Sequence, residues 1–468
     1  MSLGARRLKR SVKKRIQTSV TRRSLVLVLV LIPGLCASLS LISCGYGKTG
    51  PPSGLTNRVL APQGITSTFT FGGLVIVNGI YDTVPRLAPL SAGNSPGLMV
   101  VTPSLNIAAA FDASSNTVFA VDTAKETSIG NVHLPGPTSS MVFPTANGTG
   151  YAAVPTASVN GLSVLGAVEV INFSNQLNAI AVANAQTVIS NSGGSQLLVF
   201  SNDSNSVTVI APANAVPPVD FSCYATTATT LNPNSICTSV PGFDRPVWGI
   251  ISGNTAYILN CGAECGGTQA SVQTLDLSTF AVSAPTPVNG ATIGFLNGTQ
   301  LYVAGNGTPT GQPCASIASA AKTAATYCGT LDIVDTTTMT DPYFNSPGTE
   351  IAITDGYHDR IDLNVVGQLF IGSYDCTNIG NVNNPVGEVR GCLSIFHTAD
   401  NSVIIPPDNG NVDGLQGFTT RTVEYVAEDG FLRVYDTTQD ILLINDYIPE
   451  GTVDLVGYVG DVKAIDFF

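Results

Sequence analysis

Residues that usually carry catalysis are scarce in this chain of 468 residues. It has only three histidines, His133, His358 and His397, and none has a convincing partner for a catalytic triad. The sequence also lacks a Gly-x-Ser-x-Gly nucleophile motif and a phosphate-binding loop. These absences argue against the corresponding hydrolases and nucleotide-binding proteins. We therefore expect no catalytic residue and no cofactor.

Charged residues are also few, at 11% of the chain, whereas Gly (47) and Pro (28) are abundant. This composition disfavours long helices and favours many short strands joined by turns. Nine of the 20 Lys and Arg residues lie within residues 1–23, so the rest of the chain has 11 against 32 Asp and Glu, a formal net charge of −21. Such a surface repels nucleic acid, and we expect no nucleic-acid partner.

The N-terminus has the order of a secretory signal. Residues 1–23 are basic and contain no acid, residues 25–35 are almost wholly apolar, and small residues precede Cys44. An uncleaved membrane anchor is the alternative. However, a span needs about 20 apolar residues, and Pro33-Gly34 interrupt this run. We therefore favour a cleaved signal.

Leu41-Ile42-Ser43-Cys44 resembles the lipobox of bacterial lipoproteins, in which a signal peptidase cuts before the Cys and the new N-terminal thiol carries lipid. The resemblance implies that residues 1–43 are a signal peptide, that Cys44 is lipidated, and that residues 44–56 form a flexible tether. The protein would then be exported and lipid-anchored on the periplasmic or cell-surface side of a membrane. Gly45 is not an Asp, which in the lipoprotein sorting rule favours the outer membrane.

The export route stays open, because Thr21-Arg22-Arg23-Ser24-Leu25-Val26 resembles a twin-arginine motif, but paired arginines are common in basic signal regions. Both the twin-arginine route and the general secretory route remain compatible with the sequence.

Eight of the ten cysteines remain once Cys36 of the apolar segment and Cys44 are set aside. An even number in an oxidising compartment predicts four disulfides. Eight cysteines allow 105 pairings, and sequential pairing closes the shortest loops. It joins Cys223 with Cys237, Cys261 with Cys265, Cys314 with Cys328, and Cys376 with Cys392. The alternative, a zinc site at Cys261-Gly-Ala-Glu-Cys265, lacks a nearby His, so we expect no metal.

One unit recurs along the chain: an alternating apolar strand that ends in Asp-Thr or a related turn. Its eight instances start 39 to 65 residues apart, with a mean near 51, and several strands fit each period. Such a period is typical of a β-propeller. The Asp or Asn side chain can close the turn by accepting backbone N–H groups, so we interpret it as structural. The instances are LVIVNG from Leu74, VFAVDT from Val118, VEVINF from Val168, VTVIAP from Val207, VQTLDL from Val272, LDIVDT from Leu331, LSIFHT from Leu393 and LRVYDT from Leu432.

Asn-Thr-Val-Phe-Ala-Val-Asp-Thr and Gly-Phe-Leu-Arg-Val-Tyr-Asp-Thr resemble the YVTN-type β-propeller repeats of bacterial exported proteins. The resemblance covers residues 57–468 and implies a single all-β propeller domain there. We count eight blades of four antiparallel strands, with seven as the alternative. The first blade lacks an innermost strand at its own start. Residues 460–467 have the alternation to supply it and would close the ring by pairing the two chain ends.

The long inserts, 156–166, 211–245, 261–270, 307–328 and 375–392, are all predicted to emerge on one face of the propeller. We assign 211–245 to the connection between blades 4 and 5 and the others to loops between strands two and three. The eight cysteines lie in or at these loops, and a disulfide that closes about 15 residues contributes roughly 3 kcal/mol. Ordered loops gathered on one side of a rigid scaffold predict a binding face.

Two classes of propeller enzyme match the sequence poorly. A single Trp248 argues against quinoprotein propellers, which stack indoles around their cofactor. Asp355, His358, Asp359 and Asp362 could hold a metal as in sugar-lactone hydrolase propellers. Strand alternation would separate Asp355 and Asp359 from His358 and Asp362, so we interpret the cluster as a solvated strand end.

Two functions remain. The first is a lipid-anchored propeller of the cell envelope, not an enzyme, that binds a protein, peptide or glycan through its disulfide-stapled loops. The second is a propeller hydrolase or lyase with a metal in the central channel. Three or more carboxylates that converge at the channel mouth would favour the second, and exposed Tyr and Phe on a flat loop face would favour the first.

Overall fold

The computed structural model describes residues 51–68, 70–159, 165–173, 176–211, 221–223, 237–307, 328–344, 346, 349–376, 379–380, 389–406 and 410–466. They belong to one compact unit, Pro51–Phe468. The expected signal peptide and the lipid-bearing Cys44 lie outside the described residues. Among those residues, no helix has the length and apolar character needed to cross a bilayer.

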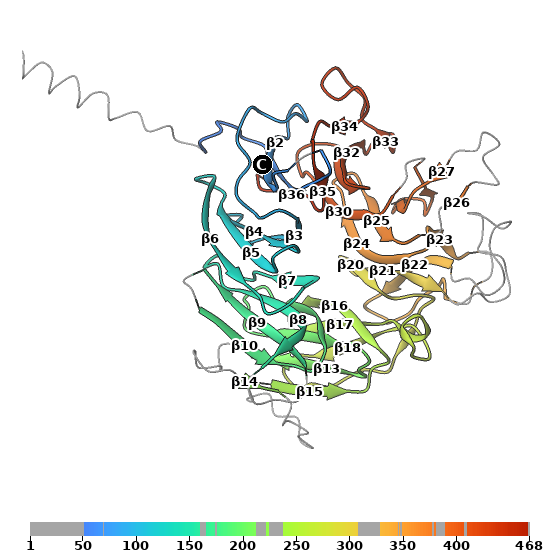
Figure 1. The fold of residues 1–468 in the computed structure, drawn as a ribbon. Helices are drawn as coiled ribbons and strands as arrows, with labels where there is room; N and C mark the ends of the chain where they lie inside the picture. The colour runs from blue at the N-terminus through green and yellow to red at the C-terminus, as the bar shows by residue number, and fades with distance from the viewer. Residues whose placement is uncertain are drawn as a thin grey trace, which may run out of the picture. The chain divides into compact units, whose positions relative to one another are not determined.

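The compact unit is an all-β, eight-bladed propeller with four antiparallel strands per blade, which confirms the predicted fold and blade count (Figure 1). Blades 1 to 4 contain these strands: in blade 1, β1 (Arg58–Gly64), β2 (Gly73–Asn78), β35 (Tyr458–Val459) and β36 (Lys463–Ala464); in blade 2, β3 (Pro96–Val101), β4 (Ile107–Asp112), β5 (Thr117–Asp122) and β6 (Thr127–His133); in blade 3, β7 (Ser140–Val142), β8 (Gly150–Ser158), β9 (Leu165–Asn172), β10 (Gln176–Ala181) and the added β14 (Phe221–Ser222); in blade 4, β11 (Ala185–Ser190), β12 (Leu197–Ser201), β13 (Ser206–Ile210) and β15 (Cys237–Pro241).

The second half of the ring is built in the same way, with the first strand of each blade at the channel and the last at the outer rim. The strands are, in blade 5, β16 (Pro246–Ser252), β17 (Thr255–Asn260), β18 (Ser271–Asp276) and β19 (Thr286–Pro287); in blade 6, β20 (Ile293–Asn297), β21 (Gln300–Gly307), β22 (Cys328–Asp335) and β23 (Ile351–Ile353); in blade 7, β24 (Tyr357–Leu363), β25 (Gln368–Tyr374), β28 (Leu393–His397) and β29 (Val403–Ile404); in blade 8, β30 (Val412–Gly417), β31 (Val423–Glu428), β32 (Phe431–Asp436), β33 (Ile441–Leu442) and β34 (Thr452–Val453). A small hairpin, β26 (Ile379–Gly380) with β27 (Val389–Arg390), and one 3-10 turn, η2 (Gly262–Cys265), lie in the loops.

All eight recurring segments lie in strands of the blade interiors: the first in β2 and the others in the third strands of blades 2 to 8. The Asp side chains that follow them act as turn formers. Asp436 Oδ1 accepts the Thr438 N–H at 2.8 Å, and Asp335 Oδ1 accepts the Thr337 N–H at 2.8 Å. These bonds confirm the structural role predicted for the Asp-Thr position.

The hydrophobic core is divided among the interfaces between blades, because each sheet buries both faces against its neighbours. The interface of blades 8 and 1, for example, is filled by Val59, Val77, Tyr425 and Val434. The innermost strands contact one another in sequence around the ring, from β3 through β7, β11, β16, β20, β24 and β30 to β36. The fold therefore surrounds a central channel lined by one strand from every blade.

The ring is closed by the two ends of the described chain, as expected from residues 460–467. β36 pairs with β1 through Val59 with Ala464 and Leu60 with Lys463, and Figure 1 shows these blue and red strands side by side. The buried Arg58 reinforces this seam. Its Nε and Nη2 donate to the two Asp466 oxygens at 2.8 Å each, and its Nη1 donates to Glu126 at 2.9 Å.

The propeller has two faces, which the strand directions define. We call the face with the strand-two-to-three loops and the connections between blades the loop face. The opposite face, where residues 51–57 join β1, is the tether face. There Ser53 donates its backbone N–H and Oγ–H to Glu126 at 2.6 and 2.5 Å, and Asn57 O accepts the Gly79 N–H at 2.7 Å.

One insert was assigned to the wrong connection. Residues 237–241 form β15, the outer strand of blade 4, so the insert after β13 joins strands three and four. It adds β14 to the outer edge of blade 3, parallel to β10. The Cys223–Cys237 disulfide therefore lies at the outer rim between blades 3 and 4. The other four inserts join strands two and three and belong to the loop face, as predicted. The prediction that all five inserts share one face was wrong for residues 211–245, because a connection between strands three and four starts at the tether-face end of β13.

Candidate functional site

Five of the innermost strands share an irregularity near their loop-face ends, where the central channel opens. In β11, β16, β24 and β30, one extra residue interrupts the pairing with the second strand, and β3 is irregular between Pro96 and Met99. Bulges of this kind turn a side chain away from the regular alternation and are common beside binding sites. The residues placed at the five bulges are Leu98, Gln186, Val247, Asp359 and Asp413.

The bulges line a cavity of about 290 Å³ at the channel mouth. Leu98, Gln186, Val247 and Asp359 all belong to its wall, and Trp248 lies beside them. A second cavity of about 270 Å³ shares Gln186, Val247 and Tyr357 with the first and reaches Cys265 on the loop face. Together the two cavities approach the size of small ligand-binding sites, which also combine apolar walls with a few polar groups.

Carboxylates are concentrated on one side of this mouth, where Asp359 of blade 7 and Asp413 of blade 8 stand on neighbouring strands. Arg360 lies between them: its Nη1 donates to Asp359 Oδ2 at 2.7 Å and its Nε donates to the Asp413 carbonyl at 2.7 Å. Asp359 Oδ1 is buried, and no hydrogen-bond partner for it exists within the described part of the chain.

The same burial changes the acidity of both side chains. It raises the pKa of Asp359 to about 6, against the opposing effect of the Arg360 charge, and nearby Asp413 and Asp461 raise it further. Burial also raises the pKa of Asp413, although the Tyr458 hydroxyl donates to its Oδ2 at 2.8 Å and lowers it. Carboxyls with a raised pKa in a cavity are frequent at functional sites.

Aromatic side chains complete the wall around these charges. Tyr357 and Tyr374 come from neighbouring strands of blade 7, with ring centroids 5.2 Å apart, and Trp248 comes from blade 5. Burial raises the pKa of the Tyr357 hydroxyl, which keeps it protonated and able to donate. On the loop face beside the mouth, Tyr458 and Phe431 are exposed, which is the feature expected of a binding face.

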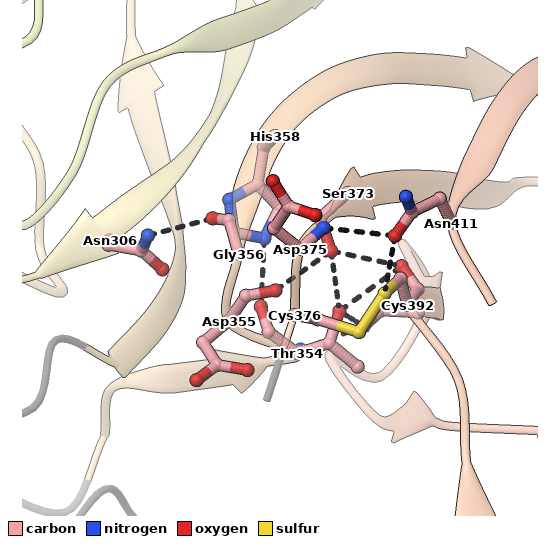
Figure 2. Close-up of a disulfide and its surroundings, with 11 residues drawn as sticks. Asn306, Thr354, Asp355, Gly356, His358, Ser373, Asp375, Cys376, Cys392 and Asn411 are labelled. Carbon is pink, nitrogen blue, oxygen red and sulfur yellow. Dashed lines mark hydrogen bonds between the residues drawn. A yellow bond between two sulfur atoms is a disulfide. The ribbon is translucent and has the colours of Figure 1, made fainter. Parts of the chain in front are cut away.

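Two disulfides hold the loops around this mouth, and both are sequential pairs of the kind predicted. Cys261–Cys265 closes the η2 turn of blade 5, and Cys376–Cys392 closes the loop of blade 7. Cys328 begins β22 at the same face, but its predicted partner Cys314 lies outside the described residues. Figure 2 shows the Cys376–Cys392 bridge beside Asn411 of blade 8, whose Oδ1 accepts the Asp375 N–H at 2.9 Å.

Hydrogen bonds join the stapled loops of neighbouring blades. Glu264, within the Cys261–Cys265 turn, accepts the backbone N–H of Asn306 at 3.0 Å and its Nδ2–H at 3.1 Å. Asn306 Nδ2 also donates to the Gly356 carbonyl at 2.7 Å, on the connection that leads into blade 7 (Figure 2). Burial raises the pKa of Glu264, and the two bonds from Asn306 oppose that rise. The loop face of blades 5 to 8 is therefore one connected polar structure.

The four residues Asp355, His358, Asp359 and Asp362 do not form a common site. His358 is fully buried, its Nε2 lies 2.8 Å from the Thr354 carbonyl, and burial lowers its pKa to about 4. Asp362 accepts the Gly417 N–H at 2.9 Å, and only Asp359 reaches the cavity. The interpretation of a solvated strand end was wrong for Asp355 and His358, because both side chains are buried.

Among the residues that the structure describes, no group of three or more His, Cys, Asp or Glu side chains is placed to hold a metal ion. Asp461 also stands near Asp359, but its Oδ2 accepts the Met99 N–H at 2.8 Å and its Oδ1 lies 3.0 Å from Lys463 Nζ. Its carboxylate therefore supports the inner ring of strands.

Sequence reasoning found the loops but missed Gln186 and Asp413 at the channel mouth, and it considered Asp359 only as part of a metal cluster that does not form. Gln186, Asp359 and Asp413 owe their position to bulges. A bulge forms where the innermost strand has one residue more than the strand paired with it, and that count depends on the pairing register. A polar residue near the start of an innermost strand is the only trace that they leave in the sequence.

Comparisons with known proteins support the fold. No family model matches this chain, and no curated protein sequence matches it. Dihydro-heme d1 dehydrogenase NirN in complex with DHE is similar in structure, with a TM-score of 0.56 at 10% identity over 88% of this chain and 75% of that one. Kuenenia stuttgartiensis hydrazine synthase has a TM-score of 0.43 at 11% identity over 76% and 80% of the two chains. The Myceliophteria thermophila Cps50 (Swd1) β-propeller domain has 0.45 at 8% over 73% and 95%. At this identity, the likeness to NirN shows the propeller fold alone.

Proposed function

We propose that this chain is an exported, lipid-anchored β-propeller of the YVTN type that binds a protein, peptide or glycan of the cell envelope on its loop face. The observation that carries the proposal is the cavity of about 290 Å³ at the channel mouth, lined by bulged residues and surrounded by the stapled loops. The lipobox around Cys44 supports the anchor and favours the outer membrane.

The chemistry of the cavity favours a partner that presents an amino group. Asp359 supplies negative charge from the cavity wall and Asp413 from the neighbouring strand, and only Arg360 opposes them directly among the described residues at this point. Trp248 and Tyr357 offer aromatic faces, which attract cations. The buried Asp359 Oδ1 has an unused acceptor site, and an ammonium group would satisfy it.

The stapled loops make such binding favourable because they are ordered before the partner arrives. The Cys261–Cys265 turn, Asn306 and the Gly356 connection are already joined by hydrogen bonds. A rigid rim loses little conformational entropy on binding, so more of the contact energy becomes affinity.

The native Trp248 provides the test, since it is the single Trp of the chain and lines the cavity. Its fluorescence is titrated with a lysine-rich peptide, and with a chitosan tetramer against the matched chitin tetramer, which lacks free amines. We expect at least one of the two amines to change the emission, chitin to leave it unchanged, and Asp359→Asn to weaken binding about tenfold, or about 1.4 kcal/mol.

Binding should also weaken as the pH falls through about 6, because Asp359 then becomes neutral. Asp400→Asn is the matched control: Asp400 lies on the same blade, at a turn on the tether face, and is exposed. An amine response that Asp359→Asn leaves intact would contradict this assignment, as would no response to any of the amines.

The runner-up is a hydrolase or lyase with a metal in the channel. No group of described carboxylates supports it, since Asp461 is bonded within the inner ring. Turnover of a substrate that chelator abolishes and a divalent metal restores would favour this alternative over the binding function.

A further inference from the structure

Exposed apolar side chains form a patch where the two ends of the ring meet. Ile80 and Tyr81 belong to the turn after β2, and Ile444 and Tyr447 to the segment between β33 and β34. Their exposed fractions run from 46% for Ile80 to 67% for Ile444, and the Tyr81 and Tyr447 rings lie 5.1 Å apart. We call these four residues the seam patch. The two rings in contact, each with an exposed Ile on the same segment, make an apolar surface of the kind that marks a site of interaction.

The seam patch is held on a firm base. Ile448, next to Tyr447, is buried in the core between blades 8 and 1, where partly buried Val84 and Leu443 pack against the same cluster. Beside Tyr81, Asp82 is buried and accepts two hydrogen bonds from Arg421, at 2.7 and 2.9 Å. The exposed rings are therefore fixed by their buried neighbours.

The patch lies at the edge where the tether face meets the outer rim. The turn that carries Tyr81 belongs to the tether face, and Gly79 in the same turn donates its N–H to Asn57 O at 2.7 Å. Asn57, at the start of β1, thus lies beside the turn that carries Tyr81, while Ser53 lies against Glu126 of blade 2. The seven Cα–Cα steps from Cys44 to Pro51 span at most about 25 Å. A lipid on Cys44 would keep this side of the propeller close to the bilayer.

We propose that the seam patch rests in the interfacial layer of the membrane that carries the anchor; this rests on the lipidation of Cys44 in the proposed function. Tyr is enriched at the membrane–water interface, where its ring meets the acyl boundary and its hydroxyl stays hydrated. The short tether supplies a high effective concentration, so a small patch is enough to set the orientation. Asp446 and Glu450 lie near Tyr447 in the chain, which favours a zwitterionic lipid surface over an anionic one.

This orientation presents the loop face to the envelope. Blade 5, which carries Trp248, lies across the ring from blade 1, and Trp248 lines the channel mouth at the opposite face. The lipid side and the binding side are then at opposite corners of the propeller, and a tethered molecule keeps its cavity open to partners.

The test uses the full lipidated chain in vesicles of zwitterionic phosphatidylcholine with brominated or plain acyl chains. Tyr447→Trp is placed in a Trp248→Phe background, and Ile444→Trp in the same background serves as a second probe of the patch. The matched control is Tyr458→Trp, an exposed aromatic position on the loop face. We expect brominated lipid to quench the indoles introduced at positions 447 and 444. The indole at position 458, and the native Trp248 of the unsubstituted chain, should stay bright.

The outcomes separate this proposal from the function on which it rests. If the protein floats with the vesicles but neither indole of the patch is quenched, the lipid anchor is supported and the membrane contact of the seam patch is refuted. Protein that does not float shows that Cys44 carries no lipid, which overturns the anchor and this proposal with it. If the emission wavelength of the Tyr447→Trp variant shifts with protein concentration in the absence of vesicles, the patch is an interface between two copies of the chain, and the membrane contact is refuted.

Discussion

Replacing Arg58 should open the propeller locally, where β1 and β36 close the ring. In the native protein it binds both oxygens of Asp466 at 2.8 Å, Glu126 at 2.9 Å and the Thr123 carbonyl, and all three charged side chains are nearly excluded from water. Arg58→Met keeps the apolar stem and removes the charge. Two buried carboxylates would then have lost the cation that lies between them.

The size of the effect follows from that burial. Breaking a buried ion pair by removing one partner costs about 3–5 kcal/mol, because an uncompensated charge stays inside. Global stabilities are about 5–15 kcal/mol, so the seam would lose a large share of its margin. The interfaces among blades 3 to 6 do not contain Arg58, and repeat folds couple mainly to nearest neighbours. We therefore expect local opening of β1 and β36 before global unfolding.

Urea unfolding measures the total loss, and amide hydrogen exchange locates it. Protection should fall in β1 and β36 of Arg58→Met while β17 in blade 5 stays protected. Lys125→Met is the matched control, since the Lys125–Asp122 pair is also short, at 2.8 Å, but the Lys125 side chain is 76% exposed. An exposed pair contributes little to stability, because water screens it. A loss below about 1 kcal/mol for Arg58→Met, or an equal loss of protection in blade 5, would refute the reasoning.

Three further outcomes are expected. Cys44→Ala should abolish radiolabelled palmitate incorporation, and incorporation equal to the unmodified protein would exclude lipidation at this site. Non-reducing peptide mapping of exported protein should link Cys314 with Cys328 as well as the three described pairs, and free thiols at most positions would contradict the oxidising compartment. Burial and the neighbouring Asp341 raise the pKa of Asp332 well above its usual value. Because the folded state then holds this proton more tightly than the unfolded state, the stabilisation is complete below the unfolded pKa and is lost as the pH rises through the folded one. Asp332→Asn should reduce the fall in the free energy of unfolding with rising pH, measured by urea unfolding between about pH 4 and pH 9. An unchanged pH dependence would contradict the raised pKa of Asp332.

The repeat could be predicted because interior strands of a blade bury both faces and keep a strict pattern. Val118 to Asp122 and Leu432 to Asp436 show apolar alternation followed by an acidic turn, and both outcomes agree with the structure. Outer strands are less regular. Cys237–Pro241 is five residues long and far from its partner β13 in the chain, so the sequence pattern offered no reason to pair them, and the insert before it was assigned to the wrong connection.

The orientation of side chains at the channel mouth could not be predicted from the sequence pattern. Alternation separated Asp359 from His358 correctly, but the bulge between His358 and Arg360 resets the pattern for every residue after it. Burial of His358 follows from the close packing of blades 6 and 7, where Thr292 donates its hydroxyl to the His358 carbonyl at 2.8 Å. Such contacts join segments far apart in the chain, and no local pattern encodes them.

The bulges have a consequence for how this protein can change. A residue opposite a regular partner must satisfy the ladder, the pleat and the packing between blades at once. Gln186, Val247, Asp359 and Asp413 have no opposite residue in the neighbouring strand. The strand register therefore places no requirement on these side chains, and Asp359 and Asp413 are held instead by hydrogen bonds from Arg360 and Tyr458. On the binding function proposed above, exchanging these few positions would change the ligand preference while the sheets keep their register.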